Sequence, residues 1–483
     1  MPKKTILSKK EKDFSKWFTE INQKAELSDL RYNVKGFIVF QPWSVLCMEK
    51  MFKHMEKALQ KKHHKPYYFP TLIPESNLKL ESSHVKGFTP EVFWVTEHGN
   101  KEKFEEKLAL RPTSETAFYK MFSIWIRSYK DLPFKTYQRA NVFRYETKAT
   151  RPFLRSREFH WIESHCAFAT EQEALQQVKE DMETTKDVLY NIFCIPFIFF
   201  KRPSWDKFAG AESTYAADVL NPDGKVIQQP STHLLGINFS KPFNVKFKDK
   251  DGKDKYCYLT CYGPAISRIF ASIIAVHGDN KGLKFPWRIA PLQVIIIPIL
   301  SEKNTQVIKK AEQIKQLLEK QDISVEIDKT EFTPGEKFYF WEMKGIPLRI
   351  ELGPKEIKQK ELTIFRRDNE KKQRIKEKDL LKFIEKTVID INNNLRKNAD
   401  SLFKNKIINV KTKKEIKRVI DQGKIARCSF CSLSKEGEKC AEYTEKEALA
   451  KVRGTRLEKE KPSGKCIICN KKAEEVVYIA RDY

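Results

Sequence analysis

Between positions 143 and 165, the 483-residue chain carries four arginines, three glutamates and two histidines among aromatic side chains. A solvated charged surface is normally built from lysine and glutamate, with few aromatics. Arginine binds phosphate through paired, charge-assisted hydrogen bonds, and nearby glutamates can orient it or accept a hydrogen bond from an amine. The stretch therefore predicts an anion-binding site, with a salt-bridged surface hairpin as the alternative.

Two strands would have to position these groups. Phe143, Tyr145, Phe159 and Trp161 alternate with charged residues at a period of two, which is typical of a strand with two different faces. Pro152 separates the two halves and predicts a loop. We therefore expect an antiparallel hairpin with an arginine-bearing loop. One face of its second strand would carry Arg157, Phe159, Trp161, Glu163 and His165.

Residues 108–126 (LALRPTSETAFYKMFSIWI) are strand-like at their start and pass through Pro112 into a helical pattern. Thr113 and Glu115 lie where this helix would begin. Helix starts favour such residues as caps. The two side chains therefore either cap the helix or point at the ammonium or imino group of a ligand.

Two later segments hold further polar groups. Gln228, Ser231 and His233 lie in strand-like sequence, where a buried hydrogen-bonded network and a ligand pocket explain them about equally well. Residues 261–282 predict a buried amphipathic helix, with Arg268 near its start among apolar side chains. Because a buried arginine is costly without an anionic partner, Arg268 favours a bound ligand over a protein carboxylate.

Composition sets wider limits on function. The 91 basic side chains exceed the 64 acidic ones by 27, which favours a polyanionic partner, although a lysine-rich proteome would give the same excess. No apolar run reaches 18 residues, so we expect no membrane span and a soluble, cytoplasmic protein. The chain also lacks the GxxxxGK[ST] signature of a P-loop and the HIGH-like signature of class I synthetases.

The patterns divide the chain into three expected domains. Residues 1–287 are rich in aromatics and in strand-like alternation. Residues 288–400 alternate strands with helices, which predicts a small α/β domain, and FWEMKGIPLRIELG (340–353) is expected to be strand. Residues 401–483 are rich in lysine and cysteine.

Five of the ten cysteines lie in this last segment, which in a cytosolic protein indicates metal before disulfides. Cys428 with Cys431, and Cys466 with Cys469, form two CxxC pairs with the spacing of a tetrathiolate zinc site. Cys440 is a fifth candidate for four positions. Reduced cysteines without metal are the alternative.

The order and spacing of these segments resemble class II aminoacyl-tRNA synthetases, and closely the prolyl-tRNA synthetases of the archaeal/eukaryotic type, along essentially the whole chain. PYYFPTLIPES (66–76) is similar to motif 1, FRYE…RPFLRSREFHWIESH to motif 2 and GPAISRIFASIIAVHGD to motif 3. RPTSET and KFAGAE are more particular to the prolyl branch. GPAISR is one residue longer than the common spacing, which affects the loop from Pro264 to Ser267.

The resemblance implies an α+β catalytic core with an antiparallel β-sheet (the class II synthetase fold), then an α/β anticodon-binding domain and a small cysteine-rich α+β domain. It implies that ATP with Mg²⁺ and L-proline give prolyl-adenylate and pyrophosphate, and that proline passes to the 3′-terminal adenosine of tRNA(Pro). The developing charge lies on phosphate oxygens, which arginines and Mg²⁺ can stabilise without a protein nucleophile.

The resemblance also assigns roles to the candidate residues. Arg144 would grip the α-phosphate and the substrate carboxylate, Arg268 the γ-phosphate, and Glu146 would orient the nucleotide, so these three are the expected catalytic residues. ATP would also contact Arg155, Ser156, Gln228 and Ser231. Proline would be surrounded by Thr113, Glu115, Arg144, Trp161, Glu163, His165 and His233.

In the α/β segment, Glu342, Arg349 and Lys355 are the candidate contacts to anticodon bases, although ordinary sheet-surface charges explain each about equally well. Pro74 of the motif 1 segment would lie at a homodimer interface. About 100 residues separate His165 from Arg268, too few for the editing domain that some bacterial-type relatives insert there.

Relatives of this type often carry a C-terminal zinc domain whose first cysteine pair is spaced more widely than two residues. The preferred metal ligands are therefore Cys431, Cys440, Cys466 and Cys469, for a structural Zn²⁺. Two rival functions remain: another class IIa synthetase, and a non-catalytic synthetase-like RNA-binding paralogue. RPTSET and the cysteine-rich tail argue against the first, and the presence of Arg144, Arg155 and Arg268 argues against the second.

Overall fold

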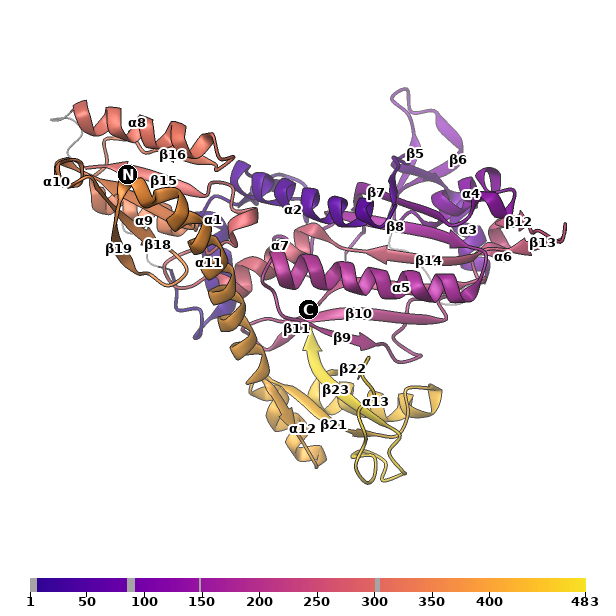
Figure 1. The fold of residues 1–483 in the computed structure, drawn as a ribbon. Helices are drawn as coiled ribbons and strands as arrows, with labels where there is room; N and C mark the ends of the chain where they lie inside the picture. The colour runs from indigo at the N-terminus through magenta and orange to yellow at the C-terminus, as the bar shows by residue number, and fades with distance from the viewer. Residues whose placement is uncertain (1–6, 85–91, 147–148, 300–304) are drawn as a thin grey trace.

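The computed structural model describes residues 7–84, 92–146, 149–299 and 305–483, and its central feature is an eleven-stranded sheet (Figure 1). Neighbouring strands are antiparallel except the pairs β3–β7 and β20–β21, and β11 also pairs in parallel with β23. In spatial order the strands are β20 (Ile407–Asn409), β21 (Ile425–Phe430), β23 (Glu475–Asp482), β22 (Lys451–Arg456), β9 (Ile198–Lys201), β10 (Ser213–Leu220), β11 (Lys225–Gly236), β14 (Tyr258–Gly263), β8 (Glu158–Phe168), β7 (Phe134–Phe143) and β3 (Lys65–Pro66).

The hairpin expected from alternating aromatic and charged residues is formed by β7 and β8, which pair antiparallel from Phe134 opposite Ala167 to Phe143 opposite Glu158. Its first strand ends earlier than expected, before Tyr145. The N–H group of Glu146 turns back to the carbonyl of Arg144 at 2.7 Å, so the chain leaves the sheet after Phe143.

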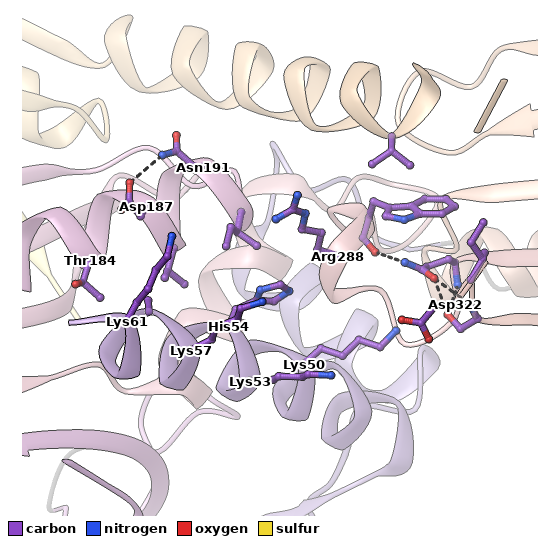
Figure 2. A pocket seen from close by; sticks show the side chains of 18 of the residues that line it. Lys50, Lys53, His54, Lys57, Lys61, Thr184, Asp187, Asn191, Arg288 and Asp322 are labelled. Atoms are coloured by element: carbon purple, nitrogen blue, oxygen red, sulfur yellow. Dashed lines mark hydrogen bonds between the residues drawn. The ribbon is translucent and has the colours of Figure 1, made fainter. Parts of the chain in front are cut away.

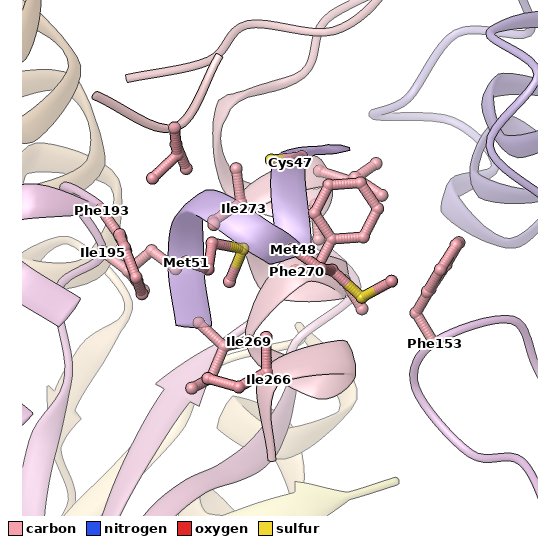
Figure 3. Close-up of a cluster of buried hydrophobic side chains, with 14 of the residues drawn as sticks. Cys47, Met48, Met51, Phe153, Phe193, Ile195, Ile266, Ile269, Phe270 and Ile273 are labelled. Atoms are coloured by element: carbon pink, nitrogen blue, oxygen red, sulfur yellow. The ribbon is translucent and has the colours of Figure 1, made fainter. Parts of the chain in front are cut away.

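Helices α2 (Pro42–Lys61), α5 (Glu171–Thr185) and α7 (Ile266–His277) lie on one side of this sheet (Figure 1). The side chains of β8 that point to this side pack on α5, as Cys166 does against Ala174. The predicted amphipathic helix is α7, and its apolar residues pack against Met48 and Met51 of α2 (Figure 3).

The arginine-bearing loop between β7 and β8 is anchored to the same core. The ring of Phe153 lies edge-on to Phe270 of α7, with centroids 5.0 Å apart, and stacks on Phe40 at 4.8 Å. The loop is therefore fixed against the helix that carries Arg268.

Smaller elements complete the first part of the chain. Three strands form a second sheet in the order β4 (Leu72–Pro74), β6 (Lys103–Leu110) and β5 (Phe93–Glu97). Short pairs are β1 (Ser28–Asp29) with β2 (Val39–Phe40), and β12 (Lys246–Lys248) with β13 (Asp254–Tyr256). The helices are α1 (Phe14–Lys24), α3 (Glu75–His84), α4 (Glu115–Trp125), η1 (Tyr129–Asp131), η2 (Lys186–Ile192), α6 (Ser240–Phe243) and η3 (Trp287–Ile289).

The next part is the expected α/β unit, with a five-stranded sheet whose core strand β15 pairs parallel with both neighbours. The sheet order is β16 (Val325–Ile327), β15 (Val294–Pro298), β17 (Leu348–Leu352), β18 (Glu361–Arg366) and β19 (Lys372–Lys376). The helices are α8 (Thr305–Glu319), α9 (Pro334–Lys344), α10 (Pro354–Gln359), η5 (Glu377–Asp379) and α11 (Leu380–Lys404).

The prediction of strand for residues 340–344 is wrong, because they form the last turns of α9. The local signals favour a helix here. Thr333 caps its start in a reciprocal pair with Glu336, and Pro334 fits the first helical position. Gly345, at a φ of 75°, ends it, and only Leu348–Leu352 form the expected strand.

The C-terminal part adds α12 (Lys413–Asp421) and α13 (Lys435–Ala448). Its strands extend the eleven-stranded sheet, because β22 pairs with β9. A buried ion cluster holds the two parts together. Asp218 of β10 accepts hydrogen bonds from Arg202 and from Arg453 of β22, each with an N···O distance of 2.6 Å. Within the described residues, no helix is long and apolar enough to span a bilayer.

Replacing Asp218 by alanine should lower the free energy of unfolding by about 3–5 kcal/mol, because two buried guanidinium groups would lose their counter-charge. Burial alone raises the pKa of Asp218, but the charges of Arg202 and Arg453 outweigh it and lower the pKa to about 2. The stabilisation should therefore be present at neutral pH and be lost as the pH falls from about 4, the ordinary aspartate value, through about 2.

Urea unfolding at several pH values measures this effect. Lys255→Ala is the control, because Lys255 pairs with Asp249 at an exposed site, where solvent screens an ion pair and it contributes little to stability. Equal losses of stability in the two variants would contradict the assigned role of Asp218.

Candidate active site

A cleft of about 600 Å³ lies on the face of the large sheet opposite α5 and α7. Phe159, Trp161, Glu163 and His165 of β8 point to this face and line the cleft, so the prediction that they share one face is confirmed. Arg157, the fifth residue of that prediction, precedes the strand and does not line the cleft. The lining also comes from the start of α4, from β11 and from the start of α7. The predicted residues that line it are Thr113, Glu115, Arg144, Glu146, Trp161, Glu163, His165, Gln228, Ser231, His233 and Arg268.

An irregularity in β11 lets Gln228 and Ser231 line the same cleft although they are three residues apart. Opposite them in β10, Asp218 pairs with Gln228 and Ala216 with Ser231, so β11 has one residue more than its partner. Such a bulge re-aims side chains. The sequence contains Pro230 at this point, the one local signal that could have indicated it.

The three arginines singled out from the sequence meet at one end of the cleft. Arg144, Arg155 and Arg268 line a small hollow of about 50 Å³ together with Glu146 and Ser156. Burial lowers the pKa of Arg268, and the charges of Arg144 and Arg155 lower it further, to about 10. Burial is the larger cause of this shift, and the two neighbouring guanidinium groups add to it, so the hollow is suited to an anion.

Protein contacts hold these arginines in place. Arg144 donates from Nε to the carbonyl of Pro112 at 3.0 Å, and its guanidinium lies 5.4 Å from the ring centre of Phe159. Arg155 pairs with Glu146 at 3.6 Å and also donates to the backbone oxygen of Tyr483.

The expectation that the nearby glutamates orient arginines holds for Glu146 only. Glu158 accepts a hydrogen bond from Asn141 at 2.8 Å, and Glu163 accepts one from Ser114 at 2.5 Å. Glu163 is buried, which by itself raises its pKa, but bonds from His165, Ser114 and Gln138 lower the pKa below its usual value. A buried carboxylate beside the cleft is thus kept ionised.

The polar side chains at the start of α4 bond to residues of the cleft and do not cap the helix. Ser114 occupies the N-cap position but makes no side-chain capping bond, because its hydroxyl donates to Glu163. Thr113 donates to Glu115, and Glu115 lines the cleft with its carboxylate. The capping interpretation does not hold at Ser114, and contact of Thr113 and Glu115 with a ligand stays a prediction.

Two aromatic groups complete the polar part of the cleft. The indole Nε1 of Trp161 is buried and has no hydrogen-bond partner among the described residues. His233 is held between Thr214 at 2.9 Å and Ser231 at 3.0 Å. Burial, with the charge of Arg202, lowers the pKa of His233 to about 3, so the ring is neutral at physiological pH.

Several functional neighbours were not predicted individually. Asp206, Lys207 and Phe208 line the cleft. Lys207 and Phe208 belong to the KFAGAE stretch that resembles the prolyl branch, but no role was predicted for either residue. Arg202 donates to the side chain of Gln228 at 3.1 Å, and Asp218 holds Arg202. The buried ion cluster therefore orients a residue of the cleft.

The candidate anticodon residues occupy different settings. Glu342, on α9, pairs with Arg349 at 2.9 Å, and Arg349 is also bound to Glu351 at 3.0 Å. Arg349 is buried between the rings of Phe338 and Phe365. Lys355, in the first turn of α10, is exposed.

The preferred cysteine set comes together at the end of the chain. The sulfur atoms of Cys431, Cys440, Cys466 and Cys469 all lie within 4.8 Å of one another, and Cys428 is not part of this group. The Sγ atoms of Cys431 and Cys440 are 3.7 Å apart. Four thiolates about 2.3 Å from a tetrahedral Zn²⁺ would be spaced by roughly 3.8 Å, so the set fits this metal.

Three family models match consecutive parts of the chain. The tRNA synthetase class II core domain (G, H, P, S and T) matches residues 93–277, the anticodon binding domain 293–387, and the prolyl-tRNA synthetase C-terminal domain 413–483. The proline--tRNA ligase of Thermofilum pendens is 46% identical over 489 residues, covering 100% of both chains. That of Methanopyrus kandleri is 41% identical, covering 98% of this chain and 96% of its own.

Solved structures agree with these matches. Prolyl-tRNA synthetase from Giardia lamblia, in complex with prolyl-adenylate, superposes with a TM-score of 0.96 at 36% identity over 99% of this chain and 100% of its own. The Cryptosporidium parvum enzyme, complexed with L-proline and AMP, gives a TM-score of 0.91 at 32% identity over 99% of each chain. The chain, with its class II core, anticodon-binding domain and characteristic C-terminal domain, belongs to the prolyl-tRNA synthetase family.

Proposed function

We propose that the chain activates L-proline with ATP and then transfers the prolyl group to the 3′-terminal adenosine of tRNA(Pro). The observation that carries this proposal is the meeting of three guanidinium groups beside a cleft lined with carboxylates. The guanidinium groups suit phosphate and the carboxylates suit an amine, and proline-dependent adenylation needs both kinds of group. The complexes of relatives with prolyl-adenylate and with proline and AMP support the same substrates.

In the first step, an oxygen of the proline carboxylate would attack the α-phosphorus of ATP. A carboxyl–phosphate bond forms, the bond to the β-phosphate oxygen breaks, and pyrophosphate leaves. Negative charge develops on phosphate oxygens, which Arg144 and Arg268 would stabilise from two sides of the hollow. Mg²⁺ would neutralise further phosphate charge.

Recognition of proline would use the carboxylate end of the cleft. Glu115 and the ionised Glu163 favour the positively charged imino group, with Thr113 and His165 beside them. Neutral His233 and Trp161 would form walls of the pocket, and the indole Nε1 of Trp161 can donate to a substrate oxygen. ATP would lie along Glu146, Arg155, Ser156, Gln228 and Ser231.

The proposed function also implies the binding partners of the protein and its location in the cell. The tRNA anticodon would bind the domain that contains Glu342, Arg349 and Lys355, with exposed Lys355 best placed to reach RNA directly. A second copy would pack near Pro74 of β4, where Tyr68 is 84% exposed and Leu72 40%. We place the protein in the cytoplasm, where reducing conditions keep cysteine thiols free.

Replacing Arg144 by alanine should lower proline-dependent ATP–pyrophosphate exchange by about 100- to 1000-fold, because a donor to the developing phosphate charge is lost. Arg157→Ala is the matched control: this arginine comes from the same loop but stacks on Tyr145, 4.1 Å from the ring centre, outside the cleft. Exchange close to that of the unmodified protein in Arg144→Ala, with folding confirmed by circular dichroism, would refute its assignment.

We also propose that Cys431, Cys440, Cys466 and Cys469 hold a structural Zn²⁺, since four thiolates leave no open coordination position. Cys440→Ser should lower the zinc content and the thermal stability of the C-terminal part, whereas Cys428→Ser should retain one zinc per chain. Elemental analysis of the purified variants measures both. Zinc lost from Cys428→Ser and kept by Cys440→Ser would reverse the ligand set.

A further inference from the structure

A second, larger depression lies on the side of the molecule that carries α2. It encloses about 1380 Å³ between α2 and η2 on one side and η3, the segment after α8 and α11 on the other (Figure 2). Sites for small molecules typically measure about 300–1000 Å³ and are mostly apolar. This depression, here called the α2 groove, is wide and lined largely by charged and polar side chains, which suits a macromolecular ligand.

A stripe of lysines runs along the α2 groove. Lys53, Lys57 and Lys61 follow one another at intervals of four residues, so they project from one face of α2, and all three are exposed (Figure 2). Like charges at this spacing repel one another and destabilise a helix. Arg288 of η3 adds a further exposed cation to the groove.

These four cations have no ion pair within the described residues. The carboxylate of Glu49, which precedes Lys53 by four residues on the same face of α2, pairs instead with Arg139. By contrast, Lys50 and Lys62, at the two ends of the stripe, have partners within the protein. Lys50 donates a hydrogen bond to the carbonyl of Ala290, and Lys62 pairs with Glu183.

Three carboxylates also line the α2 groove, and none neutralises the stripe. Asp187 accepts a hydrogen bond from Asn191 at 3.3 Å, while Asp322 lies at the Lys50 end, as Figure 2 shows, and Glu319 belongs to the last turn of α8. Burial lowers the pKa of His54, at the centre of the groove, and the charges of Arg288 and the neighbouring lysines lower it further. The groove therefore holds a net positive charge that favours an anion.

We propose that the α2 groove binds the sugar-phosphate backbone of tRNA, between its anticodon loop and its acceptor end. This inference rests on the proposed function. The groove lies where the catalytic part and the α/β domain adjoin, on the α2 side of the large sheet, so a tRNA bound to the α/β domain can extend over it. Lysines one helical turn apart, about 6 Å along the axis, match the spacing of successive phosphates on one strand. Release of counterions from those phosphates would supply affinity.

The test is the triple variant Lys53→Gln, Lys57→Gln, Lys61→Gln. Its affinity for a tRNA(Pro) transcript, measured by filter binding at several salt concentrations, should fall at least about tenfold at low salt, and the slope of log affinity against log salt should become shallower by about 2–3. The KM for tRNA in aminoacylation should rise in parallel. The triple Lys→Arg variant should bind as the unmodified protein does.

Lys435→Gln, Lys439→Gln, Lys446→Gln is the matched control, because these lysines are exposed on α13 and the change in net charge is identical. Unchanged affinity and salt slope in the α2 variant, or equal losses in the two triple variants, would overturn the proposal. Proline-dependent pyrophosphate exchange needs no tRNA and should remain normal in the α2 variant. Absence of exchange in the unmodified protein would refute the proposed function instead, independently of the groove.

Discussion

The site depends on one electrostatic arrangement: three guanidinium groups line one small hollow, and Glu146 is the carboxylate that lines the hollow with them. Their mutual repulsion and their partial burial both oppose this arrangement, as the lowered pKa of Arg268 reports. Such an arrangement is stable only where the surrounding structure holds the arginines in place. A phosphate that binds there is stabilised by positive charges that need not rearrange.

The enforcing structure is the contact between the arginine-bearing loop and α7. Phe153 fixes the loop to Phe270, two residues after Arg268, and Met48 and Met51 support α7 from behind. The sheet face then supplies the remaining groups by simple alternation along β8 and by the bulge in β11. The C-terminal part contributes as well, because Arg453 and Asp218 hold the arginine that orients Gln228. Stability and function are thus coupled through the same buried charges.

Much of the fold and of the candidate site was predictable from the sequence where the signals are local. Period-two alternation predicted the hairpin, helical spacing predicted α7, and the position of Arg268 among apolar residues favoured an anionic ligand. Contacts between distant segments were not predictable. The pairing of β22 with β9, which buries Arg453 beside Asp218, leaves no local signal, and the helix over residues 340–344 followed capping residues that the strand prediction overlooked. From the residues alone the choice among five cysteines stayed open; family resemblance favoured Cys440, which lies on α13, and the structure groups it with the other three.

The most direct test of the central claim is an experimental structure of this protein with a non-hydrolysable analogue of prolyl-adenylate. We predict that the phosphate mimic will accept hydrogen bonds from Arg144, with Arg155 and Arg268 beside the nucleotide, and that the proline nitrogen will lie next to Thr113 and Glu115. An analogue bound elsewhere, or bound in this cleft with the three guanidinium groups turned away from it, would contradict the account.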